Sequence, residues 1–543
     1  MEQEATLAII GARTRTMDHA DPAAPPSRAV AVQGSRIVAV GSDADILKRC
    51  TSRTEVIDGS GLVVTPGLVD SHSHWLWGAA QIDWVDFGAC TTVEQIQAVL
   101  SDACRGTPAG RWVKGNFLDY SAFPGGVAHR RYIEPACGDH PVYLAFFDCH
   151  SALVNDAALR LADVGADARD DARDDARDDV VMDADGPTGL LLEFAAMDLV
   201  RRTWPEATDQ QTRRQHLATM ALLNRLGITG VQMMNGRLDT ADLFRELEAT
   251  GDLSLRIDST IDLAPTMSDD DVRAFLPHLR DGGDLWRAGA VKLWLDGVIE
   301  SGTAWLREPD HHGDGRTPLW VPPERYRRCV ELFAGAGFRC TTHAIGDQAV
   351  AYALDTYARV PSGPGQRHRI EHLEVTTDDD VGRLGAEGVV ASVQPQHMMY
   401  LRGDRSDAWS QRVGDVRADQ AFRLRDLHDG GALMVLGSDW PCAPLDPRIG
   451  LAWAQLRRPP GHPQEPVVGR SDQALSSLEA FAGYTTNPAW VTSTHHERGL
   501  VRAGYLADLV AWTDDPVTCP PDRLSEMEAA LTIVDGEIRH RAR

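Results

Sequence analysis

Two histidines separated by one residue, His72 and His74, directly follow the apolar run 61–70. In an extended strand, alternate side chains point to the same side, so the two imidazoles would offer two nitrogen ligands to one metal ion. Such a pair is weak evidence by itself, because strand histidines are often satisfied by hydrogen bonds or left in solvent. The prediction of a metal site therefore depends on whether distant residues complete it.

Short apolar runs alternate with amphipathic helical patterns, such as 211–226, 268–279 and 323–335, through the middle of the chain. This alternation is typical of repeated β/α units around a parallel sheet. The candidate strands are 62–70, 142–148, 229–234, 254–261, 290–295, 339–343, 369–372, 389–394 and 433–438. They are one more than the eight strands of a (β/α)₈ barrel.

The strand at 142–148 is the one that we leave out of the barrel. About 150 residues separate the strand at 62–70 from the strand at 229–234, whereas a β/α unit needs about 30. Residues from about 80 to 205 are therefore predicted to form an inserted subdomain. Within it, residues 167–179 repeat an Asp- and Arg-rich tetrapeptide with no apolar face, which indicates a solvated loop or exposed helix, with a binding tail as the alternative.

Both ends of the chain carry strand patterns that are too few to form a core alone. Residues 29–41 are typical of a β-hairpin, and residues 507–512 and 531–539 of a strand followed by a second hairpin. We expect one small β-sandwich built from both termini, with its parts at 1–61 and 491–543. The predicted fold is thus α/β, with a (β/α)₈ TIM-type barrel at 62–490 that carries the insertion.

Residues at the carboxyl ends of barrel strands share one mouth, where such barrels place their chemistry. Besides the first two histidines, these ends carry Lys292, His343, His372 and Asp439. Each has an ordinary alternative, because the lysine could pair with a core carboxylate, the histidines could be structural and the aspartate could cap a helix. Five separate strands that end in metal-competent groups nevertheless favour a functional site.

The same segments resemble the amidohydrolase superfamily, and more closely amidohydrolase family 3, the YtcJ-like branch that includes N-substituted formamide deformylases. The resemblance covers nearly the whole chain. Its motifs are P-G-L-V-D-S-H-S-H at 66–74, V-K-L-W-L-D-G at 291–297, T-H-A-I-G-D at 342–347, R-I-E-H at 369–372, G-S-D-W-P at 437–441, N-P-A at 487–489 and the segment 504–510.

A binuclear metal centre is what this resemblance implies. One divalent ion would be held by His72, His74 and Asp439, the second by His343 and His372, and Lys292 would join them as a carbamate formed with CO₂. A neutral lysine amine can add CO₂ and become an anionic oxygen ligand, and apolar neighbours lower a lysine pKa. The donor set suits Zn²⁺, with Mn²⁺, Fe²⁺ or Co²⁺ as alternatives.

A water activated by such ions would attack a carbonyl carbon, and Asp439 would carry its proton to the leaving nitrogen. The expected catalytic residues are therefore Asp439, Lys292 and His343. The predicted function is metal-dependent cleavage of an amide C–N bond, such as that of an N-substituted formamide with an apolar substituent. The alternatives are hydrolysis of a cyclic amide, ester or carbamate, or a non-catalytic family member that binds a metabolite.

Further residues are expected to bind the substrate. His150 lies in D-C-H-S-A-L-V-N at 148–155, which is similar to the family's D-G-H-S-x-x-x-N with a cysteine in place of glycine. Glu193 lies in G-L-L-L-E, similar to the family's G-L-L-x-E, although a helix N-terminus is an equal alternative. Near the ligand segments, Trp75, Trp77, Phe117, Trp440 and His397 are expected in the pocket, with core packing as the alternative for the aromatic residues.

Composition limits the partners. A formal charge of −25 argues against a nucleic-acid groove or an anionic membrane surface, which leaves a small-molecule substrate. The nine cysteines lack C-x-x-C spacing and are expected to be reduced thiols. The first residues lack a secretory signal pattern and no stretch is apolar for long enough to span a bilayer, so a cytoplasmic location is expected. A homodimer is implied by the family resemblance alone.

Overall fold

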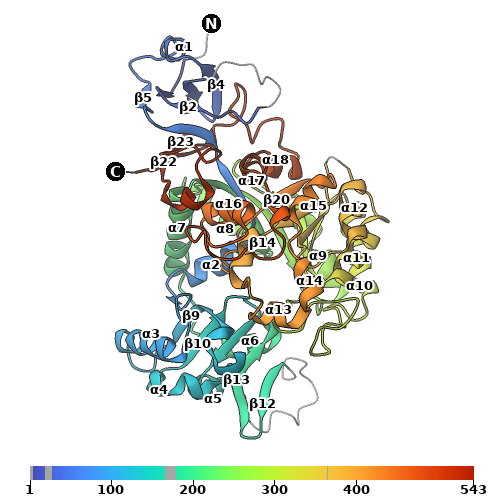
Figure 1. Cartoon of the computed structure of the whole chain (residues 1–543). Helices are drawn as coiled ribbons and strands as arrows, with labels where there is room; N and C mark the ends of the chain where they lie inside the picture. Colours follow the sequence, from blue (N-terminus) through green and yellow to red (C-terminus); the bar gives the residue numbers. More distant parts are fainter. Residues whose placement is uncertain (1–3, 19–26, 166–178, 364, 543) are drawn as a thin grey trace.

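The computed structural model describes residues 4–18, 27–165, 179–363 and 365–542. Its central sheet has eight parallel strands, namely β7 (Leu68–Ser73), β14 (Ile228–Gly236), β15 (Arg256–Leu263), β16 (Trp286–Trp294), β17 (Arg339–Ala344), β18 (Arg369–His372), β19 (Val390–Val393) and β20 (Met434–Leu436). They neighbour one another in chain order, and a parallel bridge between Ser73 and Trp440 joins the two edges. The predicted α/β fold with an eight-stranded, nearly closed barrel is confirmed (Figure 1).

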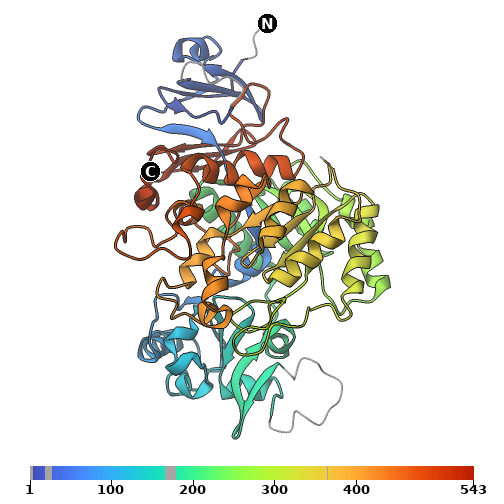
Figure 2. The same ribbon diagram turned by 45° about the vertical axis from the view of Figure 1, so that its right-hand side comes forward.

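Helices surround this barrel (Figure 2). They include α2 (Trp75–Gln81), α7 (Asp209–Arg225), α8 (Thr240–Ala249), α9 (Asp269–Ala274), α10 (Glu324–Gly335), α11 (Asp347–Tyr357), α12 (Asp378–Ala386), α15 (Leu424–Asp429), α16 (Pro447–Leu456) and α17 (Ser477–Tyr484). Local sequence explains their ends. Thr208 and Gln211 form a reciprocal capping box at the start of α7, and Thr377 and Asp380 form another at the start of α12.

One predicted helix is shorter than expected. The pattern at 268–279 predicts a single helix, but α9 ends at Ala274 and Pro277–Arg280 forms a separate 3₁₀ turn. A proline ring clashes with the preceding helical turn and lacks an N–H, so Pro277 cannot continue α9.

The segment between β7 and β14 folds into its own six-stranded sheet, cyan to green in the lower part of Figure 1. Its strands are β8 (Val85–Asp86), β9 (Val113–Leu118), β10 (Val142–Phe146), β11 (Ser151–Val154), β12 (Val180–Asp183) and β13 (Gly186–Leu192). Helix α3 (Val93–Gly106) and helix α6 (Glu193–Arg201) accompany this sheet. The strand left out of the barrel is therefore β10. Apart from Asp179, the Asp- and Arg-rich repeat at 167–179 lies outside the described residues.

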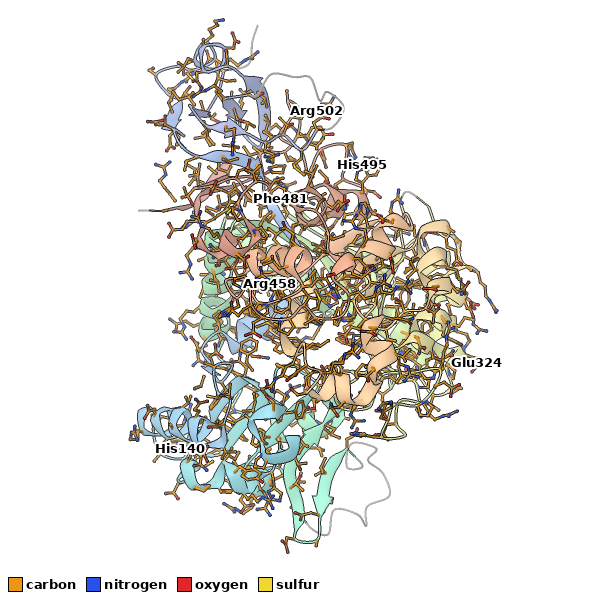
Figure 3. All side chains as sticks on the ribbon, viewed as in Figure 1. His140, Glu324, Arg458, Phe481, His495 and Arg502 are labelled. Atoms are coloured by element: carbon orange, nitrogen blue, oxygen red, sulfur yellow. The ribbon has the colours of Figure 1, made fainter. Side chains whose placement is uncertain are left out.

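Two further sheets lie at the opposite end of the molecule, as the labelled His140 in the insertion and Arg502 beside these sheets show (Figure 3). One contains β1 (Leu7–Ile10), β3 (Ala29–Gln33), β4 (Arg36–Gly41) and β5 (Glu55–Asp58). The other combines β2 (Arg13–Thr14) and β6 (Val63–Pro66) with β21 (Leu509–Trp512), β22 (Ala529–Val534) and β23 (Glu537–Arg541). Buried side chains of both sheets, including Ile9, Val30, Val64, Leu509 and Ile533, share one apolar cluster. In the described part of the chain, no helix is long and apolar enough to cross a membrane.

Candidate metal centre

The carboxyl ends of β7 and β20 bring the first histidine pair together with Asp439. One oxygen of this carboxylate, Oδ1, lies 3.3 Å from Nε2 of His72 and 3.0 Å from Nε2 of His74. All three side chains are buried, with exposed fractions of 0%, 1% and 6%. The ligand atoms of this group lie within 4.8 Å of one another, which is the spacing that one metal ion requires.

A second group gathers on the other oxygen of the same carboxylate. Asp439 Oδ2 lies 3.8 Å from Nδ1 of His372 and 3.4 Å from Nε2 of His397, and these donors also lie within 4.8 Å of one another. The ring of His343 is next to His372, with centroids 4.4 Å apart. The structure thus places His397, which was expected only as a pocket residue, beside His372 and Asp439 as a possible ligand.

The backbone is strained at two of these positions. His372 and Asp439 have φ angles of +73° and +61°, in the left-handed region that non-glycine residues rarely adopt. Such strain is found where the surrounding structure must aim a functional side chain, and it costs about 1–3 kcal/mol per residue. His372 is the last residue of β18 and Asp439 lies three positions after the end of β20, so the unusual turns redirect their side chains into the mouth.

Lys292 lies near the end of β16 with a fully buried side chain. Its Nζ has no hydrogen-bond partner in the described structure and lies 4.3 Å from the ring centroid of Trp294. Burial lowers the pKa of this amine, although the carboxylates of Glu371 and Asp439 oppose that effect. A buried amine that is readily neutral is the form that can add CO₂.

Several other buried polar atoms of the cluster also make no hydrogen bond in the described structure, although some lie close to one another. They are Nε2 of His72, Nδ1 of His74, Nδ1 of His343, both ring nitrogens of His372, Nε2 of His397 and Oδ1 of Asp439. Buried polar atoms are normally satisfied, so this concentration in one place indicates a group that the protein binds. Burial also lowers the pKa of the His343 and His372 imidazoles well below the usual range, which keeps them neutral and able to donate lone pairs. The residues therefore fit divalent metal ions.

Glu371 orients His72 from behind. Its Oε2 lies 2.6 Å from Nδ1 of His72 and accepts a hydrogen bond of 2.7 Å from Nη2 of Arg369. Burial alone would raise the pKa of this carboxyl, but Arg369 and His72 hold it well below its usual range. A carboxylate on the far nitrogen fixes the tautomer that leaves Nε2 free for a metal. Sequence reasoning gave Glu371 no role, although R-I-E-H at 369–372 places it directly before a predicted ligand.

A buried polar seam holds the first and last barrel strands together. Asp70 Oδ1 accepts the N–H groups of His72 at 3.1 Å and Ser438 at 2.9 Å, and its Oδ2 accepts the Ser438 hydroxyl. Gly437 is required beside this seam, because a Cβ atom there would lie 2.4 Å from the His72 nitrogen. The ligand geometry of β7 and β20 thus depends on a close backbone approach that only glycine allows.

A pocket opens above the cluster, with about 560 Å³ of empty space that is partly open to solvent. Its walls include Trp77, Phe147, Trp294, Tyr400, Trp409 and Phe422, and its acidic groups are Asp148, Glu300, Glu374 and Asp439. None of its lining residues, within the described chain, is a lysine or arginine. The pocket therefore combines aromatic surface with acidic side chains.

Two residues of the inserted subdomain reach this pocket together. His150 lines it, and its Nδ1 lies 2.9 Å from Oε2 of Glu193, so the hydrogen bond runs from the ring nitrogen to the carboxylate. Burial would lower the pKa of His150, but Glu193 and Asp148 raise it above its ordinary value. Glu193 itself does not line the pocket and contacts it through His150.

The predicted aromatic residues are divided between pocket and core. Trp77 lines the pocket and stacks on His74 with ring centroids 4.4 Å apart. Trp75, Phe117 and Trp440 are not among the lining residues. Trp75 packs on the Phe244 ring in the barrel core, and Phe117 belongs to the sheet of the insertion.

Trp440 is displaced from the pocket by its contact with α2. A Cβ atom on Gly78 would lie 2.0 Å from its ring, so the indole fills the space that this glycine leaves open. Proximity in sequence to a ligand was thus a poor guide to the direction of these side chains: Trp75 lies on α2, where each residue rotates the side-chain direction by about 100°, and Trp440 fills the space beside Gly78.

The chain is similar to known proteins over nearly its whole length. The model of the Amidohydrolase family matches residues 55–540. N-substituted formamide deformylase from Arthrobacter pascens is 28% identical to this chain over 99% of both proteins, and YtcJ from Bacillus subtilis is 26% identical over 94% of this chain and 96% of its own length. The crystal structure of a metal-dependent hydrolase from Pyrococcus horikoshii superposes with a TM-score of 0.72 at 23% identity, covering 95% of this chain and 99% of that protein. Because the family model covers most of its length, the chain belongs to the amidohydrolase family.

Proposed function

We propose that this protein is a metal-dependent hydrolase that cleaves the C–N bond of an amide, such as an N-substituted formamide with an apolar substituent. The observation that carries the proposal is the cluster of buried, unpartnered donor atoms around Asp439 at the floor of an aromatic pocket. The similarity over nearly full length to a protein named N-substituted formamide deformylase supports the choice of bond.

Two divalent ions, Zn²⁺ in the first instance, would be held by the residues of the cluster. His72, His74 and Asp439 would hold one ion, and His343 and His372 the other, with Lys292 as a carbamate ligand and His397 close to the second ion. When bound, the ions would supply Lewis acidity, which polarises the scissile carbonyl and ionises a water near neutral pH.

Asp439 is the group that takes a proton from the attacking water. Its carboxylate is buried, and neighbouring His72, His74 and His372 keep its pKa well below the usual range despite that burial. It is therefore ionised at neutral pH and able to accept the proton on an oxygen that faces the cluster.

The aromatic walls would bind the substituent on the amide nitrogen. Trp77 and Trp294 lie beside His74, with ring centroids 4.4 Å and 5.6 Å from its ring. A flat or branched apolar group would be desolvated between them and their neighbours, which favours binding by about 25 cal/mol for each Å² of apolar surface buried.

Formate release tests the proposal. The purified protein is loaded with Zn²⁺ and offered N-benzyl-, N-alkyl- and N-arylformamides, together with a cyclic amide, an ester and a carbamate of similar size. The proposal is supported if a formamide releases formate with the highest kcat/KM of all compounds in the panel. If the cyclic amide, the ester or the carbamate is hydrolysed with the highest kcat/KM, its hydrolysis is the activity instead. A metal content below about half an equivalent per chain after gentle purification, without turnover of any member, would favour a metabolite-binding protein.

A further inference from the structure

The His150–Glu193 pair is held in place by more hydrogen bonds than a residue that only lines a pocket would need. Asp148 Oδ1 accepts the backbone N–H groups of His150 at 3.0 Å and Ser151 at 3.1 Å, and its Oδ2 accepts the Tyr120 hydroxyl at 2.7 Å. The carbonyl of His150 in turn accepts the backbone N–H of Glu193 at 2.6 Å. Two backbone segments that are 43 residues apart thus hold the imidazole and its carboxylate in register.

Both sides of this pair have left-handed backbone conformations. Cys149, directly before His150, has φ of +59°, and Glu193 has φ of +55° where β13 turns into α6. These turns aim the imidazole and the carboxylate toward each other across the end of the inserted sheet. Strain of this kind persists where the surrounding contacts over-determine a functional geometry.

The free nitrogen of His150 faces the pocket. Because the Glu193 carboxylate only accepts hydrogen bonds, Nδ1 of His150 carries a hydrogen and Nε2 is left for another partner. Within the described chain no hydrogen bond is found to Nε2, and the ring lines the pocket with its centroid 5.9 Å from that of His343. Nε2 is therefore available to a bound substrate, and in the imidazolium, which the facing Glu193 carboxylate stabilises, Nε2 carries a hydrogen as well as Nδ1.

The pair also rests directly on the barrel. A Cβ atom on Gly297, in the loop after β16, would lie 2.8 Å from Oε1 of Glu193, and the carbonyl of the same glycine lies 3.1 Å from Nε2 of His343. The inserted subdomain thus sets its histidine against the barrel loop that also contacts a predicted metal ligand. His150 comes from the pocket wall, whereas Asp439 lies on the floor among the histidines of the cluster.

We propose that the inserted subdomain supplies the proton donor for the leaving group: His150 donates a proton from Nε2 to the leaving nitrogen, and Glu193 is the positioning residue that holds its ring. The inference rests on the proposed amide hydrolysis. The water oxygen bonds to the carbonyl carbon, and a water proton passes to Asp439. The C–N bond then breaks with its electron pair going to nitrogen, which takes the proton of His150. Solvent returns a proton to His150 while Asp439 releases its own, so the products are a carboxylic acid and an amine.

Leaving-group dependence tests this role, because a proton donor matters most when the departing amine is basic. Formanilides with graded ring substituents and an N-alkylformamide are compared in the Zn²⁺-loaded wild type and in His150→Gln, whose amide can donate a hydrogen bond but cannot transfer a proton. We expect kcat of the variant to fall about 10²-fold or more for the alkylformamide and less than tenfold for a nitroformanilide, with KM changed little.

Two substitutions of Glu193 and one of a control histidine complete the series of variants. Glu193→Ala should show the same dependence on the leaving group in weaker form, and Glu193→Gln, which keeps an acceptor oxygen for Nδ1, should restore most of kcat. The control is His140→Gln, a buried histidine of the same subdomain whose Nδ1 lies 2.9 Å from the Arg111 carbonyl and which does not line the pocket (Figure 3). It should behave as the wild type.

The outcomes separate the two proposals. If His150→Gln lowers kcat by one common factor across the series, or changes only KM, the proton-donor role is wrong while the proposed function stands. If the metal-loaded wild type turns over none of these amides, the proposed function is wrong and the inference falls with it. Metal content and circular dichroism of each variant show whether a loss of activity comes from loss of the fold.

Discussion

Substitution of Glu371 by glutamine should weaken metal binding without touching a metal ligand. The carboxylate accepts from Nδ1 of His72 at 2.6 Å and from Nη2 of Arg369 at 2.7 Å, and all three side chains are at most 1% exposed. Glutamine keeps one acceptor oxygen but presents an NH₂ group to the other donor. The His72 ring then loses the charge that fixes its tautomer.

The expected loss in metal affinity is about 10–100-fold, which is the usual effect of removing such a partner and corresponds to about 1.4–2.8 kcal/mol. The metal-free protein should also lose about 1–3 kcal/mol of unfolding free energy, because one hydrogen bond to the buried Arg369 is lost. Competition with a chromophoric chelator measures the affinity, and urea unfolding of the metal-free protein measures the stability.

The matched control is Glu387→Gln. Its carboxylate pairs with Arg383 at 2.7 Å near the surface, away from the cluster, with about a quarter of each side chain exposed. We expect at most about 1 kcal/mol of destabilisation and no change in metal affinity for this variant. If Glu371→Gln binds Zn²⁺ within threefold of the wild type, the role assigned to Glu371 is wrong.

Three further predictions concern the Asp70–Ser438 seam, the buried Lys292 amine and the acidic lining of the pocket. Gly437→Ala should lower the melting temperature and the metal content, because its methyl group would collide with His72. Gly41→Ala is the control and should be tolerated, because its methyl group meets open space. Thermal unfolding and metal analysis compare the two variants. Lys292→Met should abolish turnover, bicarbonate should not restore it, and unchanged turnover would refute the carbamate. Formamides with a carboxylate on the substituent should have kcat/KM values at least about tenfold below neutral analogues, because acidic side chains line the pocket and no lysine or arginine does in the described chain.

The barrel could be predicted because its signals are local and repeated. Most strands of the sheet lie within or beside a short apolar run, and the overlong gap before the strand at 229–234 separates β10 from the barrel, as the sheet order has it. The prediction of one helix over 268–279 gave too little weight to Pro277. This proline ends the helical stretch although the apolar spacing around it is helical. Both cases depend on neighbours along the chain rather than on contacts across the fold.

The candidate site was predictable only in part. Strand ends in a parallel barrel must meet, so the proximity of His72, His74, His372 and Asp439 follows from topology. The role of Glu371 does not, because it depends on which face of a four-residue strand meets the back of His72. The places of Trp75 and Trp440 likewise depend on side-chain packing that sequence spacing does not determine.

The pairing of β6 with β21 has a consequence for how the protein is made. Strand β6 leads into β7 through Gly67 alone, and its partner β21 lies so far along the chain that Thr65 and Trp512, which share a hydrogen bond of 3.0 Å, are 447 residues apart. At a ribosomal rate of about 5–20 residues per second, β6 waits roughly 20–90 s for that partner. Until β21 is made, the edge of β6 that it will pair with has no partner, so a nascent chain that stalls before residue 509 exposes an unpaired strand edge, which is a site of aggregation.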